Sequence, residues 1–257
     1  MSRRRRIQIG FGSIVLLGSI YLWQFGAQTV DAVLIRYEVR GLPDVSEVPA
    51  PLHDLAVSNQ VHAKVSCSGY AYKLPWDDVD AGKGRKAGAI CVTAFRSGNA
   101  FWFSSFPPAE FVTHLQNDLK MNPEQFRRHV GERASESDYS FMEQMLNART
   151  SEVSLMQSPN TADFFMWLLL LKAVAMPPAD SGVHAIRIHD FHGFQFENRR
   201  KPRFQIEDNL YSNSGGVSVI LFLKDRQSAA RITQPQINRI LDSIHQSNDH
   251  PRPLTTD

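Results

Sequence analysis

The feature that most constrains this chain is a stretch of 21 uncharged residues, Ile7 to Ala27, that follows four consecutive arginines. At a helical rise of about 1.5 Å per residue, such a stretch covers the hydrocarbon core of a bilayer, which is about 30 Å thick. A helix is the single-segment structure that satisfies its own backbone hydrogen bonds in lipid. The sequence therefore predicts a transmembrane helix over residues 7–27, with the lipid bilayer as its partner.

The charges on the two flanks predict the orientation of this helix. Four positive charges precede it, at Arg3, Arg4, Arg5 and Arg6. The residues directly behind it, 28–32, carry only Asp31. Because positively charged flanks stay in the cytoplasm, we expect residues 1–6 to form a cytoplasmic basic N-terminus. The bulk of the chain is then extracytoplasmic, in a single-pass protein of the bacterial inner (cell) membrane.

A cleavable secretory signal is the alternative interpretation of the same segment. Val30, Asp31 and Ala32 form a usable small-residue cleavage site a few residues past the apolar stretch. The apolar cores of signal peptides usually span about 7–15 residues. The longer stretch in this chain favours an anchor that is retained, and the alternative is a secreted protein that begins at Val33.

The charge balance behind the anchor limits the function classes. The chain has 28 Lys and Arg residues and 26 Asp and Glu residues, and the four N-terminal arginines leave 24 and 26 for the remainder, a net charge of −2. Nucleic-acid binding needs a clustered positive excess, so no nucleic-acid partner is predicted. One α+β domain is expected over residues 33–246, with a disordered tail over residues 247–257.

Alternating patterns predict strands in the first part of this domain. Period-two alternation marks residues 33–40, 61–73, 89–95 and 100–106 as strands, and the polar segment 74–88 between them as a long loop. The last strand, "AFWFSSF", carries more aromatic side chains than one face holds. Trp102 lies either in a core covered on both faces or in an exposed partner site, and the core is favoured.

A helical insertion is predicted over residues 107–176. Asn122 and Pro123 have the residue types of a helix cap and of a first helical position, and apolar spacing marks further helices on both sides of them. The apolar stretch from Phe164 to Met176 spans 13 residues, which is too short to cross a bilayer. A fully buried core helix is therefore expected there, with a re-entrant or membrane-lying helix as the alternative.

The last part of the domain returns to strands and closes with a helix. Strand patterns cover 183–188, 191–197, 204–211 and 217–224. Thr233 and Gln236 have the spacing of a capping box, ahead of apolar residues at i, i+3, i+4 and i+7 from Ile237. This order of elements predicts an antiparallel sheet covered by helices.

The block from His184 to Gln246 resembles the strand–strand–helix ending of the PsbP-like α/β/α sandwich proteins. The segments that carry the resemblance are "GFQFENRRKP", "LYSNSGGVSVILF" and "QPQINRILDSI". The resemblance covers about a quarter of the chain, and the helical insertion departs from the family pattern. It implies a non-enzymatic, membrane-tethered accessory domain and carries over no functional residue.

The search for catalytic or metal-binding motifs gives one local candidate. His189, Asp190 and His192 have side chains that zinc accepts, but zinc sites need three or four ligands with defined geometry, and neither an HExxH nor a Cys-x-x-Cys motif accompanies these residues. A solvated turn between two strands is favoured over a metal site. The sequence has neither a GxSxG elbow nor a phosphate-binding glycine loop. No catalytic residue, metal or cofactor is predicted.

The two cysteines, Cys67 and Cys91, lie in neighbouring predicted strands. Outside the cytoplasm they would form a lasting disulfide, which contributes about 3 kcal/mol for a loop of this size. Two buried free thiols are the alternative, because free cysteine packs like a small hydrophobic residue. The residues alone leave both interpretations open.

Taken together, the sequence predicts a membrane-anchored binding or accessory protein of the cell envelope with an unknown envelope protein as partner. A membrane-tethered hydrolase is the second hypothesis, because a Ser/His/Asp site assembled only in the fold leaves no local motif.

Overall fold

The computed structural model describes residues 48–149, 164–165, 167–172, 182–198, 204–225 and 232–247. They belong to two compact units. The larger unit is formed by Glu47–Asn147 and Met176–Asp257, and the smaller one contains Ala148–Ala175. The predicted transmembrane helix with its four arginines, the predicted strand at 33–40 and the predicted tail from residue 248 lie outside the described residues.

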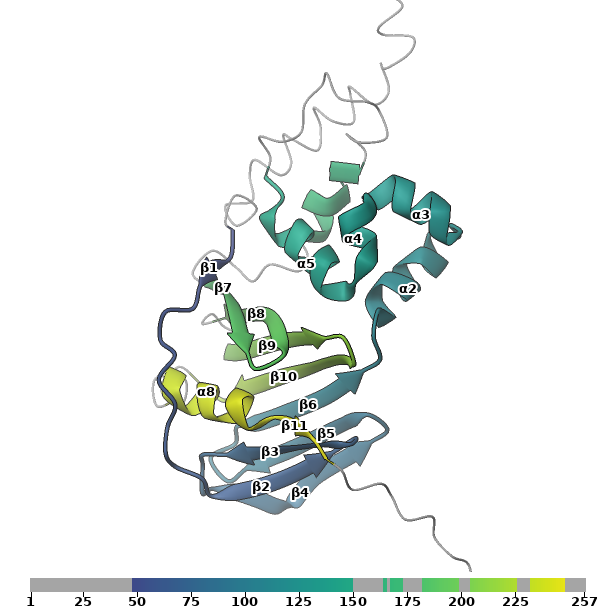
Figure 1. Ribbon diagram of the computed structural model, residues 1–257. Coiled ribbons are helices and arrows are strands. Elements are labelled where there is room, and N and C mark those ends of the chain that lie inside the picture. The colour runs from purple at the N-terminus through teal and green to yellow at the C-terminus, as the bar shows by residue number, and fades with distance from the viewer. Residues whose placement is uncertain are drawn as a thin grey trace, which may run out of the picture. The chain divides into compact units, whose positions relative to one another are not determined.

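The larger unit is built on an eight-stranded sheet (Figure 1). In spatial order, the strands are β1 (Ala50–Pro51), β7 (Val183–Ile188), β8 (Phe191–Asn198), β9 (Phe204–Ser212), β10 (Gly215–Leu223), β6 (Ala100–Phe106), β5 (Ile90–Phe95) and β4 (Val79–Ala87). All neighbours are antiparallel except β1 and β7, which are parallel. The predicted α+β class with a largely antiparallel sheet is confirmed.

A second, three-stranded sheet covers part of one face of the large sheet, in the order β11 (His245–Gln246), β3 (Tyr70–Leu74) and β2 (Ala63–Cys67). Helix α8 (Gln234–Ser243) lies beside β3 (Figure 1), and its apolar residues join one cluster with both sheets. The expectation of a single sheet covered by helices is therefore wrong for this face. The small sheet and helix α8 together cover it.

The hairpin of β2 and β3 replaces the single strand predicted over residues 61–73. Ser68 and Gly69 form its two-residue turn, with φ angles of 49° and 80°. Two successive positive φ angles match the right-handed twist of the flanking strands. The Ser-Gly pair is flanked by alternating apolar residues on both sides, so the alternation alone hid the turn.

Strand β4 replaces the polar loop predicted over residues 74–88. Among the described strands it pairs only with β5, and the register shifts between Asp80 and Arg85. Lys83 forms an ion pair with Asp80, with an N–O distance of 3.2 Å. Charged side chains and bulges are typical of edge strands, because they discourage pairing with other chains. A solvated edge strand therefore has the polar composition that was interpreted as a loop.

The core lies between the large sheet, the small sheet and α8. Phe101 and Phe103 of β6 are completely buried, and the ring of Tyr72 from β3 stacks on Phe103 with a centroid distance of 4.7 Å. Trp102 points to the opposite face, where it is half-buried beside Phe222 at 6.1 Å. The expectation that Trp102 belongs to the core is therefore wrong.

Four helices follow β6 in the larger unit: α2 (Glu110–Asp118), α3 (Pro123–Val130), α4 (Glu132–Glu136) and α5 (Asp138–Asn147). The predicted cap of α3 is confirmed, because the Gln125 N–H donates to Asn122 Oδ1 at 2.9 Å and the Asn122 N–H donates to Gln125 Oε1 at 3.0 Å. The predicted capping box of α8 is also present, with the Thr233 N–H donating to Gln236 Oε1 at 3.0 Å. Helix α4 is an addition to the prediction.

In the smaller unit, residues 164–165 and 167–172 are helical. Phe164, Leu168 and Leu169 are buried, but Leu170 is 41% exposed. The prediction of a helix buried on all sides is therefore wrong. Lys172 is completely buried, and its Nζ donates to the Ala148 carbonyl at 2.9 Å. Among the described residues, no helix is both long and apolar enough to cross a membrane.

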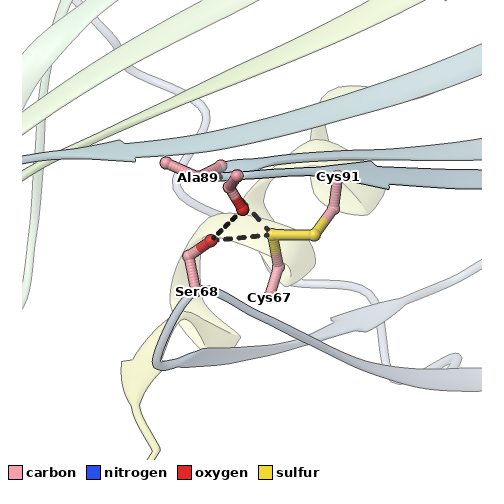
Figure 2. The surroundings of a disulfide bond; sticks show 5 residues. Cys67, Ser68, Ala89 and Cys91 are labelled. Atoms are coloured by element: carbon pink, nitrogen blue, oxygen red, sulfur yellow. Dashed lines mark hydrogen bonds between the residues drawn. A yellow bond between two sulfur atoms is a disulfide. The ribbon is translucent and has the colours of Figure 1, made fainter.

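A disulfide joins the two sheets of the larger unit. Cys67 at the end of β2 is bonded to Cys91 of β5, with a Cα–Cα distance of 6.1 Å. Figure 2 shows the bond between the two strands, with Ser68 and Ala89 beside the Cys67 sulfur. Both cysteines are buried. The bond therefore fixes the small sheet to the β5 side of the large sheet.

Candidate functional site

An open cleft of about 980 Å³ lies at one end of the large sheet in the larger unit. Five segments of the chain form it. They are the end of β6 with residues 106–109, the α4–α5 junction at 136–139, the β7–β8 turn at 187–192, the β9–β10 turn at 211–215, and residues 242 and 244–246 behind and within the end of α8. Because these segments are far apart in the sequence, no local sequence motif predicts the cleft.

Aromatic side chains line one wall of the cleft. The Tyr139 ring stacks on Phe194 at 5.5 Å and lies 5.5 Å from His192 and 6.2 Å from Tyr211, by ring centroids. Phe106 continues the row, with its ring 5.7 Å from that of Tyr211. Burial, followed by the Asp138 and Glu207 charges, raises the pKa of Tyr211. This wall therefore offers apolar ring surfaces together with tyrosine hydroxyls that keep their protons.

The Tyr139 hydroxyl is held by a helix neighbour. It donates to Glu143 Oε1 at 3.2 Å. Burial raises the pKa of Tyr139, and the charge of Glu143 and this hydrogen bond add to the effect. The ring is therefore fixed at both ends, by the stacking contact with Phe194 and by this bond.

A histidine and an aspartate meet at the rim of the cleft. His189 lies in the β7–β8 turn with a φ of 52°, in the left-handed region that L residues adopt rarely. Its Nε2 lies 3.0 Å from the Asp242 carbonyl oxygen and 3.3 Å from Asp242 Oδ1. Arg239 approaches the other carboxylate oxygen of Asp242 at 3.7 Å. These contacts hold the turn against the end of α8.

Asp138 has a structural role in the cleft wall. It is 3% exposed, and its carboxylate accepts hydrogen bonds from the N–H groups of Phe111 at 3.2 Å and Val112 at 2.9 Å. These are first-turn donors of α2, which receive no hydrogen bond from the side chain at the N-cap position, Ala109. A carboxylate satisfies such donors and complements the positive end of the helix. Asp138 therefore fixes α2 to the start of α5.

The serine hydroxyls on the cleft wall contact groups other than histidine. Ser212 Oγ donates to the Gly215 carbonyl at 2.8 Å, and Ser214 Oγ lies 3.0 Å from Ser212 Oγ. Ser137 Oγ donates to Ser140 Oγ at 2.9 Å. A nucleophilic serine needs a base within hydrogen-bond reach. The hydrogen bonds of these hydroxyls therefore go to a carbonyl group and to other serines.

The three residues of the metal candidate from the sequence make contacts with different parts of the fold. His189 faces Asp242, His192 packs against Tyr139, and Asp190 is exposed at the turn. Within the described ranges, no group of three or more His, Cys, Asp or Glu side chains is placed to hold a metal ion. The three residues share the cleft, but not as a ligand set.

The sequence predicts that His189, Asp190 and His192 lie in a turn, but it does not predict the other residues of the cleft. Asp242 and Tyr139 are brought to the turn by the fold, and neither has a local signal that could have found it. The four arginines lie outside the described residues. No protein-family model matches this chain, and no curated protein matches its sequence.

Proposed function

We propose that this protein is a membrane-anchored, extracytoplasmic binding or accessory protein of the cell envelope, and that the cleft is its ligand site. The disulfide between Cys67 and Cys91 is the observation that carries the proposal. Disulfides persist in oxidising compartments outside the cytoplasm. The arginine flank at the N-terminus favours the same side of the membrane for the bulk of the chain.

The contents of the cleft support binding as the activity. Its aromatic wall and its polar rim resemble the usual composition of ligand sites, in which apolar area supplies affinity and a few polar groups supply orientation. The resemblance of residues 184–246 to PsbP-like proteins supports the same class, because it implies a tethered accessory domain. The expected partner is another protein of the cell envelope.

The topology is tested with a reporter fused behind Asp257. We expect a periplasmic reporter to be active and a cytosolic one to be inactive, and the full-length protein to stay in the membrane fraction after an alkaline wash. A reporter active only in the cytosol, or a protein released by the wash, contradicts the proposal. Mass spectrometry of the mature N-terminus separates the alternatives, because a chain beginning at Val33 has lost a signal peptide.

A second candidate function is a membrane-tethered hydrolase. The contact between His189 and Asp242 in an open cleft favours it, because a histidine and the carboxylate that orients it are two of the three members of a catalytic triad. A fluorophosphonate probe tests it on the full-length protein. Labelling that is lost in a His189→Ala variant supports the hydrolase, and an unlabelled protein favours the binding function.

A further inference from the structure

The cleft carries more negative than positive charge. The side chains on its wall include four carboxylates, Glu136, Asp138, Asp190 and Asp242, and one guanidinium, Arg187. Asp138 is engaged with the N–H groups of α2, but Glu136 and Asp190 are exposed. Electrostatic complementarity guides the choice of partner. A cationic ligand therefore fits this cleft better than an anionic one.

Within the part of the chain that the structure describes, no strand pairs with the β11 edge of the small sheet, and this edge borders the same cleft. Strand β11 is the outer strand of that sheet, and both its residues line the cleft and are exposed. The Ser247 N–H donates to the Gly69 carbonyl at 2.6 Å, and Gln246 lies opposite Tyr70. Because backbone groups alternate in direction along an antiparallel strand, the N–H and C=O of Gln246 point away from β3.

We propose that the cleft binds a basic, extended segment of a partner protein, which pairs with β11 as an added strand. This inference rests on the proposed binding function and names the class of its ligand. Strand addition uses main-chain hydrogen bonds for affinity and side-chain pockets for specificity. The backbone of Gln246 supplies the main-chain hydrogen bonds, and the exposed carboxylates supply the specificity for basic side chains. The aromatic wall receives the alternate side chains, where a lysine or arginine gains further contact with the rings of Tyr139 and Phe106.

Fluorescein-labelled peptides of defined composition test the proposal on the full-length protein in detergent micelles. The probes are seven-residue peptides of alternating Lys and Val, of alternating Glu and Val, and of alternating Lys and Pro. Fluorescence anisotropy measures their affinity. We expect the Lys-Val peptide to bind most tightly, because the Glu-Val peptide meets like charges and proline has no N–H to donate.

Two sets of variants separate charge from strand pairing. Glu136→Gln with Asp190→Asn is expected to weaken the Lys-Val peptide about tenfold, at a modest loss for each exposed charge pair. The control pair, Asp77→Asn with Glu132→Gln, removes two exposed carboxylates outside the cleft and is expected to leave the affinity unchanged.

Gln246→Pro tests the strand addition. Proline removes the outward N–H and leaves the pairing with β3 in place, since proline is tolerated where an edge N–H faces outward. We expect at least a tenfold loss of affinity from Gln246→Pro and no comparable loss from Gln246→Ala, which keeps the N–H. Unchanged binding in Gln246→Pro, or equal binding of the Glu-Val peptide, overturns the inference.

A glycan probe distinguishes this inference from the proposed function. If the cleft binds chitotetraose in place of the peptides, the peptide class is wrong and a binding function still stands. If the reporter behind Asp257 is active only in the cytosol, the proposed location is wrong, whatever the peptide affinities show.

Discussion

The two ends of helix α8 lie on the same side of the large sheet but contact opposite kinds of residues. Toward its C-terminal end, Ile240 and Leu241 join the cluster that contains Phe103, and all three are at most 2% exposed. Toward its N-terminal end, Gln234 exchanges two hydrogen bonds with Gln195 of β8, both at 3.0 Å. Helix α8 therefore covers two regions. The apolar half is the cluster that contains Phe103, Ile240 and Leu241, and the polar half contains Gln195, Asp208, Gln234 and Asn238.

Part of the polar half is buried as completely as the apolar half. Gln195 and Asp208 lie opposite each other on β8 and β9, with exposures of 0% and 1%. Within the described part of the chain, Asp208 Oδ1 has no hydrogen-bond partner. Buried polar groups cost free energy unless they are paired. We therefore expect the apolar half and its disulfide to supply the stability that offsets the cost of burying these polar groups.

The largest effect is expected from Phe103→Ala in the apolar half. Removing a buried phenylalanine ring costs about 3–5 kcal/mol, through lost burial and the cavity left behind. The free energy of unfolding of the full-length protein in detergent, measured with urea, tests this. Phe222→Ala on the half-buried face is the matched control, with an expected loss below about 2 kcal/mol. Equal losses in the two variants would contradict the assignment of the core.

The disulfide is expected to give the next largest effect. Cys67→Ala with Cys91→Ala should lower the free energy of unfolding by about 3 kcal/mol, the typical value for a closed loop of this length. Reducing agent should destabilise the natural protein by a similar amount and leave the double variant unchanged. Alkylation of both cysteines in the folded, unreduced protein would show that the bond is absent.

The sequence predicted those elements whose signals are local. The strands from β7 to β10 and the caps at Asn122 and Thr233 were placed from alternation and from residues within one helical turn. It failed where context decides. The turn at Ser68 lies between two apolar alternations. Strand β4 has the polar composition of a loop because only one of its edges is paired among the strands that the structure describes.

The candidate site was harder to predict than the fold. His189 contacts Asp242, which lies 53 residues further along the chain, and Asp138 caps a helix 26 residues before it. Neither pairing has a periodic or spaced pattern. Asp208 falls on the apolar face by period-two alternation with Ile206 and Leu210, and this signal was overlooked because an acidic side chain is rarely buried without a partner.

Asn238 offers a way to break the polar half. Its Nδ2 donates to the carbonyl oxygens of Asp54 at 2.7 Å and Ala56 at 2.8 Å, and its Oδ1 accepts from Gln234 at 2.8 Å. Asn238→Ala is expected to cost about 2 kcal/mol, since buried polar groups lose their partners. Asn209→Ala on the half-buried face is the control, with an expected loss below about 1 kcal/mol. Similar losses would mean that the polar half has no special role.

Asp208→Asn is expected to have the smallest effect near pH 4, and to stabilise the protein at higher pH. Burial raises the pKa of Asp208 well above its ordinary value, and the charges of Glu197 and Glu207 add to the shift. In the unfolded chain an aspartate ionises near pH 4. As the pH rises above that value, the unfolded state loses its proton while the folded state keeps it, so the free energy of unfolding falls. This loss continues until the pH reaches the raised pKa.

The asparagine variant has no such proton to lose, so its advantage over the natural protein should grow as the pH rises above about 4. Urea unfolding of both proteins at several pH values measures this difference. Asp77→Asn, at an exposed aspartate, is the control variant. A parallel pH dependence in Asp208→Asn and the natural protein would mean that Asp208 is ionised when folded. A partner for that charge would then have to lie among the polar side chains around Asp208. The two halves would differ in the chemistry of their contacts but not in their contribution to the free energy of unfolding.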